Sequence, residues 1–99
     1  MLRITKIKTS KDIDMRLGTA VEVLVSISEK TATVIIKIED PSDAVKTDNV
    51  TMTRLNNYNY QYIYQSASTD DSGEYTITIT ATSNGVTAVS QTNFELISQ

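Results

Sequence analysis

Apolar residues recur at every second position in several separate segments of this 99-residue chain. The clearest alternating segments are residues 21–27, 34–38, 58–64 and 75–81, and no segment carries the 3.6-residue apolar stripe of a helix. Successive side chains of a β-strand point to opposite faces, so the pattern predicts strands with one buried face and one solvent-exposed face. Val, Ile and Thr, which strands favour, make up 34 of the 99 residues. We therefore predict an all-β fold, a two-sheet antiparallel sandwich of seven or eight strands.

The dipeptide Asn84-Gly85 is the strongest hairpin signal in the sequence, because both residues tolerate the positive φ angles of a two-residue type I′ turn. Such a turn pairs Tyr75 with Phe94, so that the apolar sets of the two strands share one face. Asn84 and Gly85 are thus expected to fix the register of this hairpin. The last strand carries two polar residues on its inner face, Ser90 and Thr92. We therefore predict that this strand lies at the edge of its sheet, where the core is thin.

The composition excludes several kinds of chemistry. The chain contains no Cys and no His, which rules out disulfides, thiol chemistry, imidazole metal ligands and Ser-His or Cys-His catalytic pairs. It has 9 basic and 12 acidic residues and a net charge of −3, which is unsuited to coating nucleic acid or an anionic membrane. The sequence also has no glycine-rich phosphate loop and no nucleophile beside a base. We expect no enzyme activity, no catalytic residue, no cofactor, no nucleic-acid partner and no direct insertion into a membrane.

The length of 99 residues fits one domain. The first residues lack the apolar core of about 7–15 residues that marks a signal peptide. Strand-like sequence begins almost at Met1 and continues nearly to Gln99. We expect residues 1–99 to form a single domain excised from a longer multidomain protein, the alternative being a small complete cytosolic protein.

The segment Asp71-Ser72-Gly73-Glu74-Tyr75 resembles the D-x-[GA]-x-Y signature of immunoglobulin-like domains. The tyrosine of that signature forms a tyrosine corner, in which the ring packs in the core and the hydroxyl bonds backbone a few residues upstream. By this resemblance Tyr75 takes that role and reaches toward Thr69 or Asp70. Gly73 leaves space beside the chain, and Asp71 fixes the turn.

The cysteines and the buried tryptophan of antibody-type domains are missing from this sequence. Ile77 stands at the position of the second cysteine, and Val23 or Val25 stands at the first. The chain looks most like the cysteine-free immunoglobulin-like and fibronectin-III-like modules of bacterial and archaeal surface or secreted proteins, mainly over residues 58–97. This resemblance implies an immunoglobulin-like sandwich and an extracellular or cell-surface location.

Asp70, Asp71 and Glu74 form a small acidic cluster. One hypothesis is a calcium site, because Ca²⁺ takes carboxylate oxygens among its ligands. The other hypothesis, which we favour, is structural: Asp71 fixes the turn and pairs with Arg54, as an arginine of the preceding region often does in immunoglobulin-like domains. No residue is therefore assigned as a metal ligand.

Four tyrosines alternate along the strand expected over residues 58–64: Tyr58, Tyr60, Tyr62 and Tyr64. An exposed tyrosine stripe is able to stack on sugars or bases, whereas a core-facing stripe is structural. Bases are disfavoured because no Lys or Arg follows Arg54. The burial of the rings discriminates between a glycan platform and a core strand.

The leading expectation is a non-catalytic immunoglobulin-like structural or adhesive module, a spacer or stalk unit, of a prokaryotic cell-surface or secreted protein. One alternative is a glycan-binding accessory domain of a secreted polysaccharide-degrading enzyme, and another is a phage structural decoration domain. The expected partners are neighbouring domains of the same chain, with a protein or glycan ligand left open. These expectations follow from the resemblance, since such folds host many functions.

Overall fold

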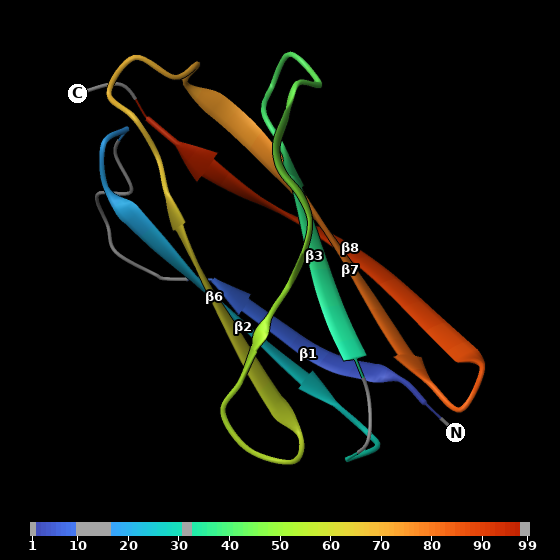
Figure 1. Ribbon diagram of the computed structural model, residues 1–99. Helices are drawn as coiled ribbons and strands as arrows, with labels where there is room; N and C mark the ends of the chain where they lie inside the picture. The colour runs from blue at the N-terminus through green and yellow to red at the C-terminus, as the bar shows by residue number, and fades with distance from the viewer. Residues whose placement is uncertain (1, 10–16, 31–32, 98–99) are drawn as a thin grey trace.

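The computed structural model describes residues 2–9, 17–30 and 33–97, and these residues form two antiparallel sheets and no helix (Figure 1). The strands are β1 (Ile4–Thr9), β2 (Ala20–Ile27), β3 (Thr33–Glu39), β4 (Val45–Thr51), β5 (Thr53–Arg54), β6 (Asn59–Gln65), β7 (Gly73–Ser83) and β8 (Val86–Leu96). One sheet has the order β1-β2-β6-β5 and the other has the order β4-β3-β7-β8. The predicted all-β sandwich is confirmed, and the arrangement is compatible with an immunoglobulin-like fold.

The apolar alternation of the sequence becomes an alternation of burial in the structure. In β2 and β3 every second side chain is buried between the sheets. Each such side chain stabilises the folded state by about 1.5–3 kcal/mol through removal of apolar surface from water. The largest fully buried side chains come from β2, β3, β7 and β8: Tyr75, Ile36, Ile38, Ile77, Ile79, Leu96, Val21, Val23, Val25 and Val34.

The hairpin of β7 and β8 has the register that the sequence predicts. Its pairing runs without a shift along all eleven rungs and includes the pair Tyr75–Phe94. The turn residues Asn84 and Gly85 have φ angles of 51° and 80°, both positive as a type I′ turn requires. The rings of Tyr75 and Phe94 stack in the core with their centroids 5.3 Å apart.

β1 and β8 are edge strands of their sheets. The pairing of β1 with β2 shifts between Ile4 and Lys6, which explains why apolar alternation breaks before Ile7. On β8, Ser90 and Thr92 are half-buried, as expected where the core thins toward the edge of a sheet.

The chain enters and leaves the described sandwich at opposite ends (Figure 1). The Ser28 N–H donates to the Arg3 carbonyl oxygen at 2.9 Å, which holds Arg3 beside the end of β2. The Leu17 N–H donates to the Ile97 carbonyl oxygen at 2.9 Å, which holds Ile97 beside the start of β2. The Cα atoms extend 43 Å along the long axis, against 23 and 16 Å across it. The path from Arg3 to Ile97 therefore crosses the sandwich from one end to the other.

Candidate functional site

Tyr75 lies near the start of β7 with its ring in the core and its hydroxyl bonded to upstream backbone. The hydroxyl donates to the carbonyl oxygen of Asp71 at 2.7 Å, so the acceptor predicted from sequence, Thr69 or Asp70, is wrong. The Asp70 N–H bonds the Ala67 carbonyl oxygen at 3.0 Å and closes a turn. Asp71 is the first residue after that turn and supplies the carbonyl. Burial is the main cause that raises the pKa of Tyr75 to about 12.

Gly73 occupies a position that a side chain would not fit. Its φ angle is 134°, in a region open essentially to glycine alone. A Cβ atom placed there would lie 3.0 Å from Cγ of Pro41 and 3.3 Å from its Cβ. Gly73 thus lets the chain that enters β7 pass close to Pro41. The resemblance implies a glycine for this reason, because it leaves space beside the chain.

Asp70 makes the turn contacts that the sequence assigns to Asp71. One Asp70 carboxylate oxygen accepts the Ala67 N–H at 2.9 Å, and the other accepts the Lys46 ammonium at 3.3 Å. The Ala67 bond, with the Lys46 contact beside it, holds the pKa of Asp70 below its usual range. The Asp71 carboxylate instead accepts the Ser42 hydroxyl at 2.9 Å. Asp70, and not Asp71, therefore closes the turn and contacts a basic residue.

The expected pairing of Arg54 with Asp71 is wrong. Arg54 lies on β5 opposite Tyr60, near the start of β6, whereas Asp71 follows the far end of that strand. The Arg54 guanidinium donates to the Asn57 side chain and to the carbonyl oxygen of Lys30 at 3.2 Å. Its structural role is therefore to tie the loop after β5 to the chain that follows β2.

The calcium hypothesis finds no ligand set in the part of the chain that the structure describes. No group of three or more acidic side chains there is placed to hold a metal ion. The Lys46 ammonium lies 3.3 Å from an Asp70 oxygen and 3.9 Å from an Asp40 oxygen, so its single positive charge offsets part of the negative charge of the two carboxylates. The other Asp40 oxygen accepts the N–H groups of Ser42 and Ala44, which fixes the turn after β3.

Most of the tyrosine stripe faces the core. Tyr60 is 3% exposed and Tyr64 is 6% exposed, while Tyr58 is 47% exposed. Tyr62 is half-buried, and its hydroxyl lies 3.2 Å from the Thr47 hydroxyl. Burial is the main cause that raises the pKa of Tyr64. These positions leave no continuous aromatic platform for a flat ligand.

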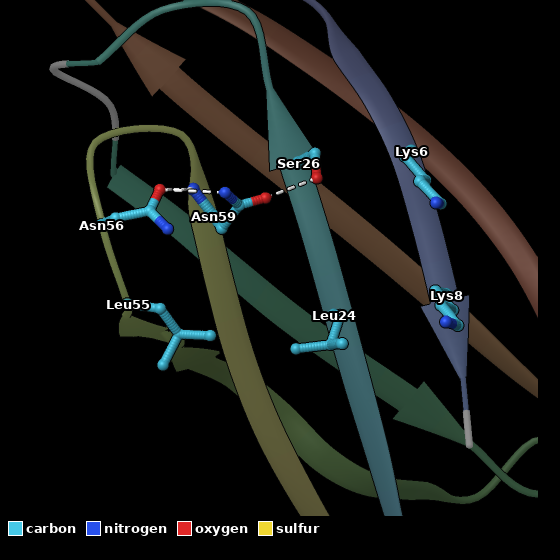
Figure 2. Close-up of a pocket in the computed structure, with 7 residues that line it drawn as sticks. All are labelled: Lys6, Lys8, Leu24, Ser26, Leu55, Asn56 and Asn59. Carbon is cyan, nitrogen blue, oxygen red and sulfur yellow. Dashed lines mark hydrogen bonds between the residues drawn. The ribbon is translucent and has the colours of Figure 1, made fainter.

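A shallow hollow of about 300 Å³ lies on the outer face of the β1-β2-β6-β5 sheet. Figure 2 shows lysines of β1 along one side, side chains of the β5–β6 loop on the other, and β2 between them. The lining residues are Lys6, Lys8, Leu24, Ser26, Leu55, Asn56 and Asn59. Among the described residues, neither lysine has an acidic partner.

Hydrogen bonds fix the polar side of this hollow. The Ser26 hydroxyl donates to the Asn59 side-chain oxygen at 2.6 Å, and the Asn59 amide donates to the Asn56 side-chain oxygen at 2.9 Å (Figure 2). The same Asn56 oxygen accepts the N–H groups of Tyr58 and Asn59, which orders the loop before β6. With ammonium and amide groups beside leucine side chains, the hollow suits a small anionic or polar group.

Sequence reasoning missed this hollow. The available signal was the outward position of Lys6 and Lys8 on either side of Ile7, which alternation alone reveals. The opposite wall comes from a loop about fifty positions later in the chain, so the hollow exists only once β1, β2 and β6 lie side by side.

Comparisons with known proteins give this chain no family assignment. No family model matches the sequence, and no curated protein matches it. In the described residues no helix is long and apolar enough to cross a membrane.

Proposed function

We propose that this chain is a non-catalytic spacer module of a prokaryotic cell-surface or secreted protein, with neighbouring domains of the same chain as its partners. The observation that carries the proposal is the position of Arg3 and Ile97 at opposite ends of a sandwich 43 Å long. A module built in this way adds length to a protein each time it is repeated.

The proposed relationship to cysteine-free immunoglobulin-like and fibronectin-III-like modules is supported by two features. The strand order β1-β2-β6-β5 faces the order β4-β3-β7-β8, as expected for a sandwich of this class. Tyr75 bonds the Asp71 carbonyl oxygen across the crossover between β6 and β7. A spacer of this type needs no catalytic group, which agrees with a chain that has neither His nor Cys.

The burial of the tyrosines argues against the glycan-binding alternative. Stacking on a sugar needs exposed rings, and Tyr60 and Tyr64 are 3% and 6% exposed. No aromatic side chain lines the hollow on the outer sheet face. We therefore retain the spacer proposal and do not propose a glycan-binding role.

The proposal is tested with a chain that carries two copies of the 99 residues in tandem. Small-angle X-ray scattering in about 0.3 M salt gives its maximum dimension, with a single copy measured beside it as the control. An end-to-end spacer predicts a tandem about twice as long as the single copy. A tandem that folds back, with two copies side by side and little gain in length, would contradict the proposal.

A further inference from the structure

Exposed positive charge gathers at one end of the sandwich. Four exposed basic residues surround the end of β2 and form what we name the basic end: Arg3, Lys6, Lys30 and Arg54. The Arg3 backbone N–H donates to the Ser28 hydroxyl at 2.8 Å, and Lys6 is the register partner of Ser26. The Arg54 guanidinium bonds the Lys30 carbonyl oxygen at 3.2 Å, which brings those two residues together. The one described acidic residue nearby, Glu29, is half-buried.

Exposed negative charge gathers at the opposite end, where β3 finishes and β7 begins. Four exposed acidic residues form what we name the acidic end: Asp43, Asp71, Glu74 and Glu95. The Ser42 hydroxyl donates to the Asp71 carboxylate at 2.9 Å and joins the two loops of this end. Within the described ranges, the base at this end is Lys46, and its ammonium contacts Asp40 and Asp70 rather than any of these four carboxylates.

Two of these four carboxylates, those of Glu74 and Glu95, stand opposite each other, an arrangement that favours a cationic partner at this end. The two residues are direct cross-strand neighbours on β7 and β8. Like charges placed opposite each other lower the stability of a sheet. Departures from local preference of this kind are typical of functional surfaces.

We propose that copies of this chain dock head to tail, with the basic end of one copy against the acidic end of the next. Four exposed positive charges then meet four exposed negative charges, and the hollow beside Lys6 offers a recess for an acidic side chain. Each copy keeps one free end of each sign, so the contact is heterologous and builds open rows. The contact uses the same two ends that the spacer proposal gives to neighbouring domains, and the tests below use separate copies, so that either proposal can fail without the other.

Contacts between solvent-exposed charges give specificity and rate more than affinity, so the docking is weak and depends on salt. The direction of the salt dependence distinguishes docking of the ends from the effect of net charge. Each copy carries a net charge of −3, and simple repulsion between copies weakens when salt is added. Docking of opposite ends predicts the reverse, with association highest at low salt.

Sedimentation velocity of the 99-residue chain over a range of concentrations measures this directly. Between about 0.02 M and 0.5 M salt the Debye length falls from roughly 20 Å to roughly 4 Å. The proposal predicts a weight-average mass that rises with concentration at low salt, passes beyond a dimer, and returns to a monomer at high salt. A chain that is monomeric at low salt, or that associates more at high salt, would overturn the proposal.

A matched pair of single substitutions tests the location of the contact. Lys30→Glu and Lys37→Glu change the net charge equally, but Lys30 belongs to the basic end and Lys37 lies on the outer face of β3 opposite Thr78. The Lys30→Glu chain should associate less than wild type at low salt, and the Lys37→Glu chain should retain its association. Equal losses in the two chains would contradict docking through the ends.

Mixing two charge-altered chains gives a test that does not depend on loss of association alone, because the mixture should regain it. Arg3→Glu with Lys30→Glu brings the formal charge of the basic end to zero, and Glu74→Lys with Glu95→Lys does the same for the acidic end. Each chain alone should be monomeric at low salt, and a 1:1 mixture should form heterodimers that do not grow further. A mixture that stays monomeric while wild type associates would contradict the pairing of these two ends. The heterodimer also shows that both altered chains are folded.

Discussion

The hydroxyl of Tyr75 donates a 2.7 Å hydrogen bond to the carbonyl oxygen of Asp71, four residues earlier in the chain. This bond joins the start of β7 to the loop that arrives from the other sheet. The Tyr75 ring meanwhile packs at 5.3 Å from Phe94 and 6.1 Å from Tyr64. One side chain therefore stabilises both the crossover between the sheets and the end of the core.

Removing the Tyr75 hydroxyl should separate these two contributions. We expect Tyr75→Phe to lower the free energy of unfolding by about 1–3 kcal/mol, because a backbone carbonyl loses its partner. Tyr75→Ala also opens a cavity and should cost about 3–5 kcal/mol. Urea unfolding measures both, and Tyr58→Phe is the control because Tyr58 is 47% exposed. If Tyr75→Phe unfolds like wild type, the corner contributes nothing to stability.

Stability should fall at alkaline pH because the buried tyrosines resist ionisation. The pKa of Tyr75 is raised to about 12 and that of Tyr64 is raised further, against about 10 in the unfolded chain. This contribution is complete below pH 10 and is lost as pH rises from about 10 toward about 12. Urea unfolding across this range should show a decline, smaller in Tyr75→Phe. An identical decline in that variant would assign the effect to other groups.

Asp70 should govern part of the acid sensitivity. Its pKa is lowered in the folded state, so its contribution is present above the unfolded value of about 3.9 and is lost as pH falls through the lower folded value. Asp70→Asn should cost about 1 kcal/mol at pH 7 and flatten the stability profile below about pH 4. Asp71→Asn is the matched control and should change stability by less than about 0.5 kcal/mol. Larger losses from Asp71→Asn would show that Asp71 fixes the turn, as the sequence predicts.

The two glycines of β7 and its turn should differ in their tolerance of a side chain. Gly73→Ala meets both a φ of 134° and the Pro41 ring at 3.0 Å, and should cost about 1–3 kcal/mol. Gly85→Ala meets open space and only the strain of a φ of 80°, and should cost about 1 kcal/mol. Thermal unfolding of the two variants gives the order, and a Gly85→Ala chain less stable than Gly73→Ala would contradict it.

The strands could be predicted from sequence because their information is local. Alternation at Val21–Ile27 and the turn at Asn84-Gly85 specify which side chains face the core and how β7 pairs with β8. The contacts of Arg54 and Asp70 could not be predicted in this way. They depend on where Lys30 and Lys46 arrive from other parts of the chain, and no local pattern encodes that meeting.

The basic end and the acidic end could likewise be predicted from sequence only in part. The outward position of Lys6 follows from alternation on β1. Its placement with Lys30 and Arg54 at one end of the molecule, opposite Glu74 and Glu95, follows only from the sheet order and the path of the chain. The net charge of −3, counted from the sequence, does not show that basic and acidic residues lie at opposite ends of the molecule.

The central claim, that the chain is built to span between its two ends, is tested most directly by pulling single molecules in two directions. The sequence lacks cysteine, so introduced cysteines are unique attachment points. Arg3→Cys with Glu95→Cys applies tension end to end, and Glu74→Cys with Glu95→Cys pulls neighbouring rungs of β7 and β8 apart as the control.

End-to-end tension shears β1 along β2 and β8 along β7, and so loads many backbone hydrogen bonds at once. Tension between positions 74 and 95 opens the β7–β8 ladder one rung at a time. Forced unfolding follows the unfolding rate, so the shear geometry should resist to a higher force at the same pulling speed. A higher unfolding force end to end is the result that the spacer account predicts. An end-to-end force equal to or below the force that peels β7 from β8 would contradict it.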